Sequence, residues 1–275
     1  MARTFEEQVE GLTGLSIDGS SAPNWSEIAQ FLKDGVKDVT NKVIGLMPNK
    51  KIFFSKVGTD TGGGVIITGD VLSVTRNNGT SDLPCARISS SLVGLISDST
   101  SMHYKSAHNP AWYIKENVVK VVPVATVSNT ASVEYIGYDN NITENNLTIQ
   151  YMPEEYHYLV VMYAGIKSLE NNLSSIALTL PASPLMNAPD WADTNTWIST
   201  EEDSEMLTSR VQEIQAKVAE FTARVQDLQA EGTLEVQKIT SDYTRVHERL
   251  KMLAGQYQAS FASMMAPKAP QQGKA

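Results

Sequence analysis

Cysteine is nearly absent from this 275-residue chain, which contains a single one, Cys85. One cysteine excludes an internal disulfide framework and a zinc site built from several cysteines. Basic residues are also few, because 22 lysines and arginines stand against 31 aspartates and glutamates, for a formal net charge of −9. Such a surface repels phosphates, so the composition argues against a general electrostatic grip on nucleic acid.

A long hydrophobic run is missing too. The most apolar stretch, Tyr158 to Ile166, is far too short to cross a bilayer. Residues 1–10 carry charges and no apolar segment, so they lack the pattern of a secretory signal. We therefore expect a protein that is made in a reducing cytoplasm, has no membrane partner, and either stays soluble or joins an assembly.

Hydrophobic spacing divides the chain into segments of different character. Residues 1–22 are polar and interrupted by glycine, which predicts a flexible N-terminal arm. Apolar side chains recur every three or four residues over 23–50 and again over 152–178, where Pro153 falls in the first turn. Both segments are therefore predicted to be helices, and we expect them to pack together as the core of a helical bundle.

Residues 51–151, between these helices, have the pattern of an antiparallel β-domain. Short runs rich in β-branched residues alternate with turn signals such as Gly62-Gly63-Gly64 and Asn77-Asn78-Gly79. We expect about five or six strands. No helical segment of useful length separates them, which disfavours a parallel α/β sheet.

The C-terminal quarter has the sharpest periodicity. A connector over 179–203 contains prolines and two tryptophans, an amphipathic, coiled-coil-like helix follows over 204–261, and a flexible tail is expected over 262–275. Apolar residues of this helix fall at alternating steps of four and three, the heptad pattern of a coiled coil. We call them the heptad stripe: Leu207, Val211, Ile214, Val218, Phe221, Val225 and Leu228. The predicted class is α+β, a helical bundle with an inserted antiparallel β-domain and a long C-terminal heptad-repeat helix.

A second stripe runs from Val236 to Tyr257, and its start lies eight residues after Leu228, with Gly232 between. The four extra residues either form a stutter in one long helix or mark the turn of a helical hairpin. The similar lengths of the stripes favour the hairpin. The very short loop and the eight-residue step, which keeps both stripes on nearly one face, favour the long helix, and we adopt the long helix.

No residue pattern indicates catalysis, a cofactor or a metal. The three glycines at 62–64 lack the spacing of a phosphate loop and are interpreted as a turn. His103 and His108 flank a polar loop, and His157 follows two glutamates at a helix start as a packing or capping residue. Cys85 lies in a strand-like run, which favours a small buried residue over a nucleophile. We therefore expect no catalytic, cofactor-binding or metal residues, and no enzyme.

Two features indicate a partner surface. Large aromatic side chains in a connector either pin it to the body or contact a partner. A seam as long as the heptad stripe buries little inside one small domain, so it suggests self-assembly or docking to another helix. The candidate subunit or partner interface is therefore Trp191, Trp197, Val211, Ile214, Val218, Phe221, Val225 and Leu228.

Four segments together are similar to a known family. They are Ile28 to Val39, Asn109 to Ile114 with the valine-rich strand that ends at Pro123, Met152 to Leu169, and Leu253 to Tyr257. The third segment, which begins with a proline and contains a Tyr-His pair, is the most specific. The combination resembles the head–tail connector (adaptor) proteins in the neck of tailed bacteriophages.

The resemblance implies a structural virion protein at the head–tail junction. It implies a ring of identical subunits, commonly twelve, that sits below the portal protein and contacts a tail or nozzle protein. Genomic DNA would pass through the ring during ejection without sequence-specific binding, and a mildly negative wall would avoid sticking. The alternatives are another neck, tail or fibre protein, trimeric through its heptads, and a tail-associated hydrolase.

Overall fold

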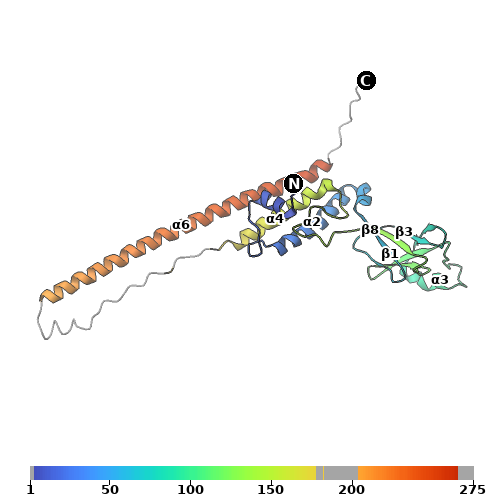
Figure 1. Cartoon of the computed structure of the whole chain (residues 1–275), viewed down its shortest axis with the longest axis horizontal. Helices are drawn as coiled ribbons and strands as arrows, with labels where there is room; N and C mark the ends of the chain where they lie inside the picture. The colour runs from blue at the N-terminus through green and yellow to red at the C-terminus, as the bar shows by residue number, and fades with distance from the viewer. Residues whose placement is uncertain (1–2, 178–181, 183–203, 266–275) are drawn as a thin grey trace, which may run out of the picture. The chain divides into compact units, whose positions relative to one another are not determined.

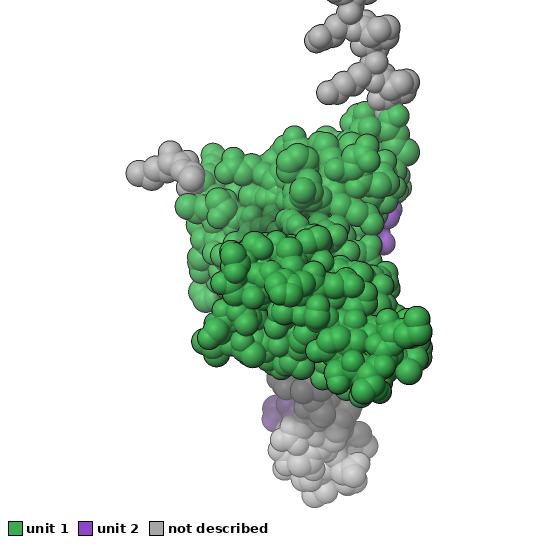
Figure 2. Space-filling model, turned by 90° about the vertical axis from the view of Figure 1, so that its right-hand side faces the viewer, with its two compact units in different colours: residues 1–171, 250–275 green, residues 172–249 purple. Residues whose placement is uncertain are grey.

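The computed structural model describes residues 3–177, 182 and 204–265. These form two compact units, residues 1–171 with 250–275, and residues 172–249, coloured green and purple in Figure 2. The first unit contains a helical body and a β-domain, and the second contains most of a long helix (Figure 1). The predicted α+β class is confirmed, including the long C-terminal helix.

The helical body is built from α1 (Phe5–Thr13), α2 (Trp25–Leu46), α4 (His157–Ser175) and residues 250–265 of α6 (Ser204–Met265). The side chain of Asn24 caps α2 by accepting the N–H of Glu27 at 3.0 Å. Gly35 lets α4 approach closely, because a Cβ there would lie 3.1 Å from Tyr163 and 3.2 Å from Val160. Leu159 is fully buried in the shared core. The predicted packing of the two helices is confirmed.

The flexible arm predicted over residues 1–22 is wrong for its helical part. Thr4 and Glu7 form a reciprocal capping box at the start of α1. Phe5, Val9 and Ile17 are buried in the body core. The segment is polar in composition, but burial of these three apolar side chains stabilises it. The capped start of the helix stabilises it further.

The β-domain holds two four-stranded sheets. One has the order β1-β8-β3-β4 and the other β2-β7-β6-β5. The strands are β1 (Ser55–Asp60), β2 (Val65–Ile66), β3 (Val71–Asn77), β4 (Asp82–Pro84), β5 (Ala86–Arg87), β6 (Ala111–Lys115), β7 (Val118–Val122) and β8 (Ala131–Ile136). Short helical segments η1 (Pro48–Phe54), η2 (Ser90–Leu92), α3 (Val93–Ser97) and η3 (Glu154–Tyr156) complete the first unit.

Three predictions about this domain need correction. More strands are described than the five or six expected, because β2, β4 and β5 are too short to show a period. The β5–β6 pair is parallel, with Ala86 opposite Ala111, whereas the other pairs are antiparallel. The domain boundary at residue 151 lies too late, because Ile142 and Ile149 belong to the core of the helical body.

Helix α6 is continuous from Ser204 to Met265, so the long-helix alternative is confirmed over the hairpin. Gly232 lies within it, and the helix extends into the segment predicted as tail. The connector over 179–203 lies outside the described residues except for Ala182. None of the described helices combines the length and hydrophobicity that a membrane span requires.

Candidate assembly surface on helix α6

The heptad stripe lies along the N-terminal part of α6, within the second unit. The alternating steps assign Val211, Val218 and Val225 to a positions and Leu207, Ile214, Phe221 and Leu228 to d positions. None of the seven side chains is buried. Val211 is 52% exposed and Val218 46% exposed. The predicted stripe therefore exists as a continuous apolar face that is left open among the residues the structure describes.

Cationic side chains border this stripe at its g positions, Arg210, Lys217 and Arg224. Arg210 and Lys217 both pair with Glu213, the latter at 2.9 Å, and their hydrogen bonds lower the pKa of the Glu213 carboxyl. Arg224 pairs with Glu220 one turn away. Exposed pairs of this kind add little stability. These charged side chains make the helix surface beside the heptad stripe polar, so the stripe is distinguished from that surface by its apolar character.

The C-terminal end of α6 is covered, in contrast. Leu253 is 1% exposed, Tyr257 6% and Phe261 8%. Tyr257 and Phe261 join the core of the helical body, and their rings meet edge to face with centroids 5.0 Å apart. Residues at the end of the second stripe thus anchor the helix to the rest of the first unit.

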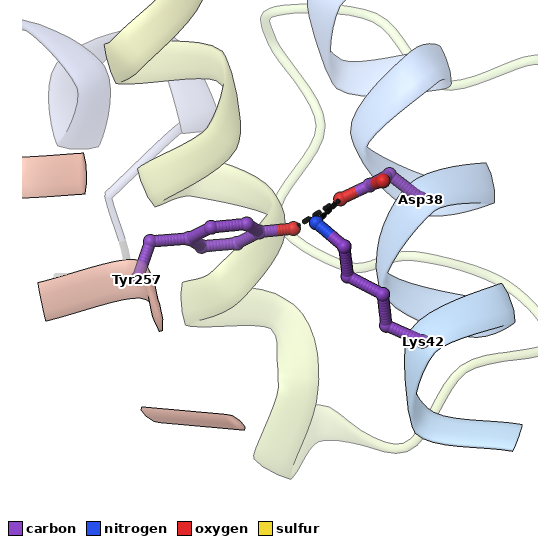
Figure 3. A network of polar contacts seen from close by, with 3 residues as sticks. All are labelled: Asp38, Lys42 and Tyr257. Atoms are coloured by element: carbon purple, nitrogen blue, oxygen red, sulfur yellow. Dashed lines mark hydrogen bonds and ion pairs between the residues drawn. The ribbon is translucent and has the colours of Figure 1, made fainter. Parts of the chain in front are cut away.

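A polar network reinforces this anchor (Figure 3). The Tyr257 hydroxyl of α6 donates a hydrogen bond to Asp38 of α2, and Lys42 pairs with the same carboxylate at 2.7 Å. The ammonium group of Lys42 also lies 4.8 Å from the centre of the Tyr257 ring. Burial raises the pKa of Tyr257, and the hydrogen bond to Asp38 raises it further. The phenol is therefore held in its protonated, donating form.

The six helix residues predicted as interface, Val211, Ile214, Val218, Phe221, Val225 and Leu228, share one face of α6 and stay unburied. Trp191 and Trp197 lie outside the described residues. Sequence reasoning missed the network of Asp38 and Lys42. Their spacing of four residues on a helix indicates only a surface ion pair, and nothing in the sequence links it to Tyr257.

The glycine turn at residues 62–64 and the side chain of His157 both have structural roles. The Asp60 carboxylate accepts the N–H groups of Gly62 and Gly64 at 2.7 and 2.8 Å, which confirms the predicted turn. His157 contacts the Met152 carbonyl oxygen at 3.2 Å and packs edge to face on Phe5. The predicted packing role is thus confirmed for His157.

Cys85 is half-buried rather than buried, and burial raises the pKa of its thiol to about 11. A thiol with this pKa is almost entirely protonated near neutral pH, so it is a poor nucleophile. Among the described residues, no group of His, Cys, Asp and Glu side chains is arranged to hold a metal ion. His108 lies in an exposed loop, where its ring contacts the Asn78 amide at 3.4 Å.

Comparison with known proteins adds no relative. No model of a known protein family matches the chain, and no curated protein matches it significantly. An assignment of function therefore depends on the sequence resemblance and on the geometry of the described residues.

Proposed function

We propose that this chain is a non-enzymatic structural protein of a tailed-phage virion, which assembles with copies of itself into a connector ring between the portal vertex and the tail. The observation that carries the proposal is the open heptad stripe on α6. Its apolar side chains are unburied on a helix whose other end is fixed in the body. An apolar face of this kind needs a protein partner to remove it from water.

The size of the stripe supports assembly. From Leu207 to Leu228 the stripe extends about 30 Å along the helix, at about 1.5 Å per residue. Complete burial of a large aliphatic or aromatic side chain contributes about 1.5–3 kcal/mol. The stripe as a whole would therefore contribute on the order of 10 kcal/mol, which is comparable with the cost of about 4–15 kcal/mol for association. Because these two free energies are similar, stable assembly requires further contacts between subunits. A ring in which neighbouring subunits share a large surface provides such contacts.

The charge of the chain fits a passage for DNA. A formal net charge of −9 disfavours tight binding of phosphates, so DNA would slide past such a surface during ejection. The resemblance supplies the remaining partners of the proposal, namely the portal protein on the head side and a tail or nozzle protein on the other side. Twelve subunits is the ring size that the resemblance implies.

Labelling of virions with a gold-conjugated antibody against this chain tests the proposed location. We expect label at the junction of head and tail in electron micrographs. Label at fibre tips would support the fibre protein instead, and absence of the chain from purified virions would contradict a structural role.

The number of subunits separates the candidates further. Light scattering should find a mass that is a multiple of the 30.1 kDa of one chain. The ring size that the resemblance implies corresponds to twelve chains. Three chains would support the fibre protein, and a monomer that turns over a substrate would support the hydrolase.

A further inference from the structure

We propose that the partner of the heptad stripe is the same stripe of a second copy, paired in parallel and in register as a two-stranded coiled coil. This inference rests on the self-association proposed above and adds the direction and register of the contact. Two copies of one helix can also pair in opposite directions. The residues on and beside the stripe distinguish the two arrangements.

The core positions favour the parallel arrangement. All three a positions hold valine, namely Val211, Val218 and Val225, whereas the d positions hold Leu207, Ile214, Phe221 and Leu228. In a parallel pair, a positions pack on a positions and d on d. β-Branched residues at a with leucine at d favour two strands, a pattern that all three a positions and two of the four d positions follow. In an antiparallel pair every layer joins an a to a d position. The separation of valine from the larger side chains would then have no packing consequence.

The flanking charges point the same way with a smaller effect. The e positions are neutral: Thr208, Gln215, Thr222 and Gln229. In a parallel pair each g cation faces an e position of the second copy, so Arg210, Lys217 and Arg224 meet side-chain oxygens that can accept hydrogen bonds.

The antiparallel alignment that covers the whole stripe has a less favourable centre. Lys217 of each copy faces Arg224 of the other there, while Arg210 faces Glu231 at the two ends. Attraction at the ends only offsets the repulsion at the centre, since such pairs contribute about 0.2–0.5 kcal/mol each.

The stutter gives a third, independent reason. After the eight-residue step, Val236 is 46% exposed and Tyr243 49% exposed, and Ile239 between them is only partly buried. In a parallel, in-register pair both stutters fall at the same level, so the seam can continue onto these residues. In the antiparallel alignment they lie beyond the overlap of the two described helices. A stripe that packs on itself is an isologous contact with two-fold symmetry, so this pair would join two copies within the assembly, and the ring would close through other surfaces of the subunit.

Site-directed crosslinking of the full chain tests the direction, in a Cys85→Ser background. Val218→Cys places a thiol at an a position, where a parallel pair brings it beside the thiol at position 218 of the second copy. Ala216→Cys is the matched control, because it lies at the f position on the opposite face of the same turn. We expect most Val218→Cys chains to form disulfide-linked dimers on mild oxidation, and the control to form few.

A mixture of Val211→Cys and Leu228→Cys chains reports the opposite arrangement. An antiparallel pair places these two positions in one layer, whereas a parallel pair separates them by about 25 Å along the helix. We expect disulfide links only between two cysteines at position 211 or between two cysteines at position 228. Mass spectrometry of the linked peptides identifies them. Val211–Leu228 links, with Val218→Cys no better than its control, would overturn the parallel pair and leave self-association standing.

Charge substitution gives a second measurement without crosslinking. The triple variant Gln215→Glu, Thr222→Glu and Gln229→Glu places acids opposite the g cations of a parallel partner. In an antiparallel pair the new carboxylates at positions 215 and 222 would instead face each other. The control triple variant, Ala216→Glu, Ala223→Glu and Ala230→Glu, adds the same charge at f positions. We expect a several-fold lower dissociation constant for the first variant than for the control, by sedimentation or light scattering.

Three further outcomes are decisive. Weaker association of the e-position variant than of its control would overturn the parallel pair. Multimers by light scattering without crosslinks above the controls would overturn the stripe as the contact. A monomer at all concentrations would overturn the proposed assembly itself.

Discussion

The two ends of α6 carry the same kind of apolar stripe in opposite surroundings. Toward the C-terminus, Leu253 is 1% exposed and lies beside Gly165 of α4, and Tyr257 is 6% exposed in the core of the helical body. Toward the N-terminus, Val211 is 52% exposed and Val218 46% exposed. Apolar residues recur at alternating steps of three and four at both ends. A heptad pattern therefore predicts that a face needs a cover, but does not predict whether the same chain or another chain supplies it.

The largest expected effect comes from shortening one leucine in each stripe. Leu253→Ala should lower the free energy of unfolding by about 2–5 kcal/mol, because it leaves a cavity at a fully covered site. Leu228→Ala, the matched control on the same helix, should lower it by less than about 1 kcal/mol in dilute solution, where its site is partly exposed. Urea unfolding of both variants at low protein concentration measures the difference.

Equal losses for the two variants would mean that the N-terminal stripe is covered within one subunit. A negligible loss for Leu253→Ala would mean that the body does not hold the end of α6. Either result removes the contrast between the two ends.

The hydroxyl of Tyr257 should contribute next in size. Tyr257→Phe removes the hydrogen bond to the Asp38 carboxylate, and bonds to charged groups contribute about 1.5–3 kcal/mol. Tyr243→Phe is the control, because Tyr243 is 49% exposed on the same helix and should lose almost nothing. Denaturant unfolding near pH 8 measures both variants.

The pH dependence of stability supplies a further check on Tyr257. Burial and Asp38 raise the pKa of the phenol above the value of about 10 that it has in the unfolded chain. Its contribution is thus fully present below about pH 10 and is lost as pH rises toward the folded pKa. Tyr257→Phe should therefore lose less stability than the parent between about pH 9 and 11. Parallel curves for the two proteins would contradict the role of the network.

The smallest effect concerns the glycine between the stripes. A Cβ at Gly232 would meet no atom within 4 Å, so Gly232→Ala should stabilise α6 by about 0.5–1 kcal/mol. Gly255→Ala is the matched substitution, equally open, at the covered end. Thermal melts and helix content by circular dichroism check both. A clear loss of stability for Gly232→Ala would mean that the helix does not pass through this residue.

Local pattern predicted much of the fold. The period of apolar residues found α2, α4 and the continuous α6, because each buries or presents one regular face. Helix α1 was missed, although its capping signature was readable: Thr4 is followed three residues later by Glu7, with Phe5 between. The polar composition of the segment concealed a helix that needs only a few buried side chains.

Contacts between distant segments could not be predicted. The hydrogen bond of Tyr257 to Asp38 spans 219 positions, and no local signal pairs them. The parallel β5–β6 pair joins strands that are short and far apart in the sequence, so register and direction depend on the tertiary fold. At the candidate interface, spacing placed all six helix residues on one face, yet could not predict that Leu253 and Tyr257 of the second stripe would be covered instead.

The mass of the full chain in solution, with and without charges on the stripe, tests the central claim most directly. The parent chain should form a multimer by light scattering, and Val218→Lys with Phe221→Lys should dissociate it, because each buried lysine costs a few kcal/mol. The variant should keep the circular dichroism spectrum and the melting transition of a folded subunit, since both sites are unburied in it. A double variant that retains the mass of the parent multimer would contradict the claim that the heptad stripe of α6 holds the subunits together.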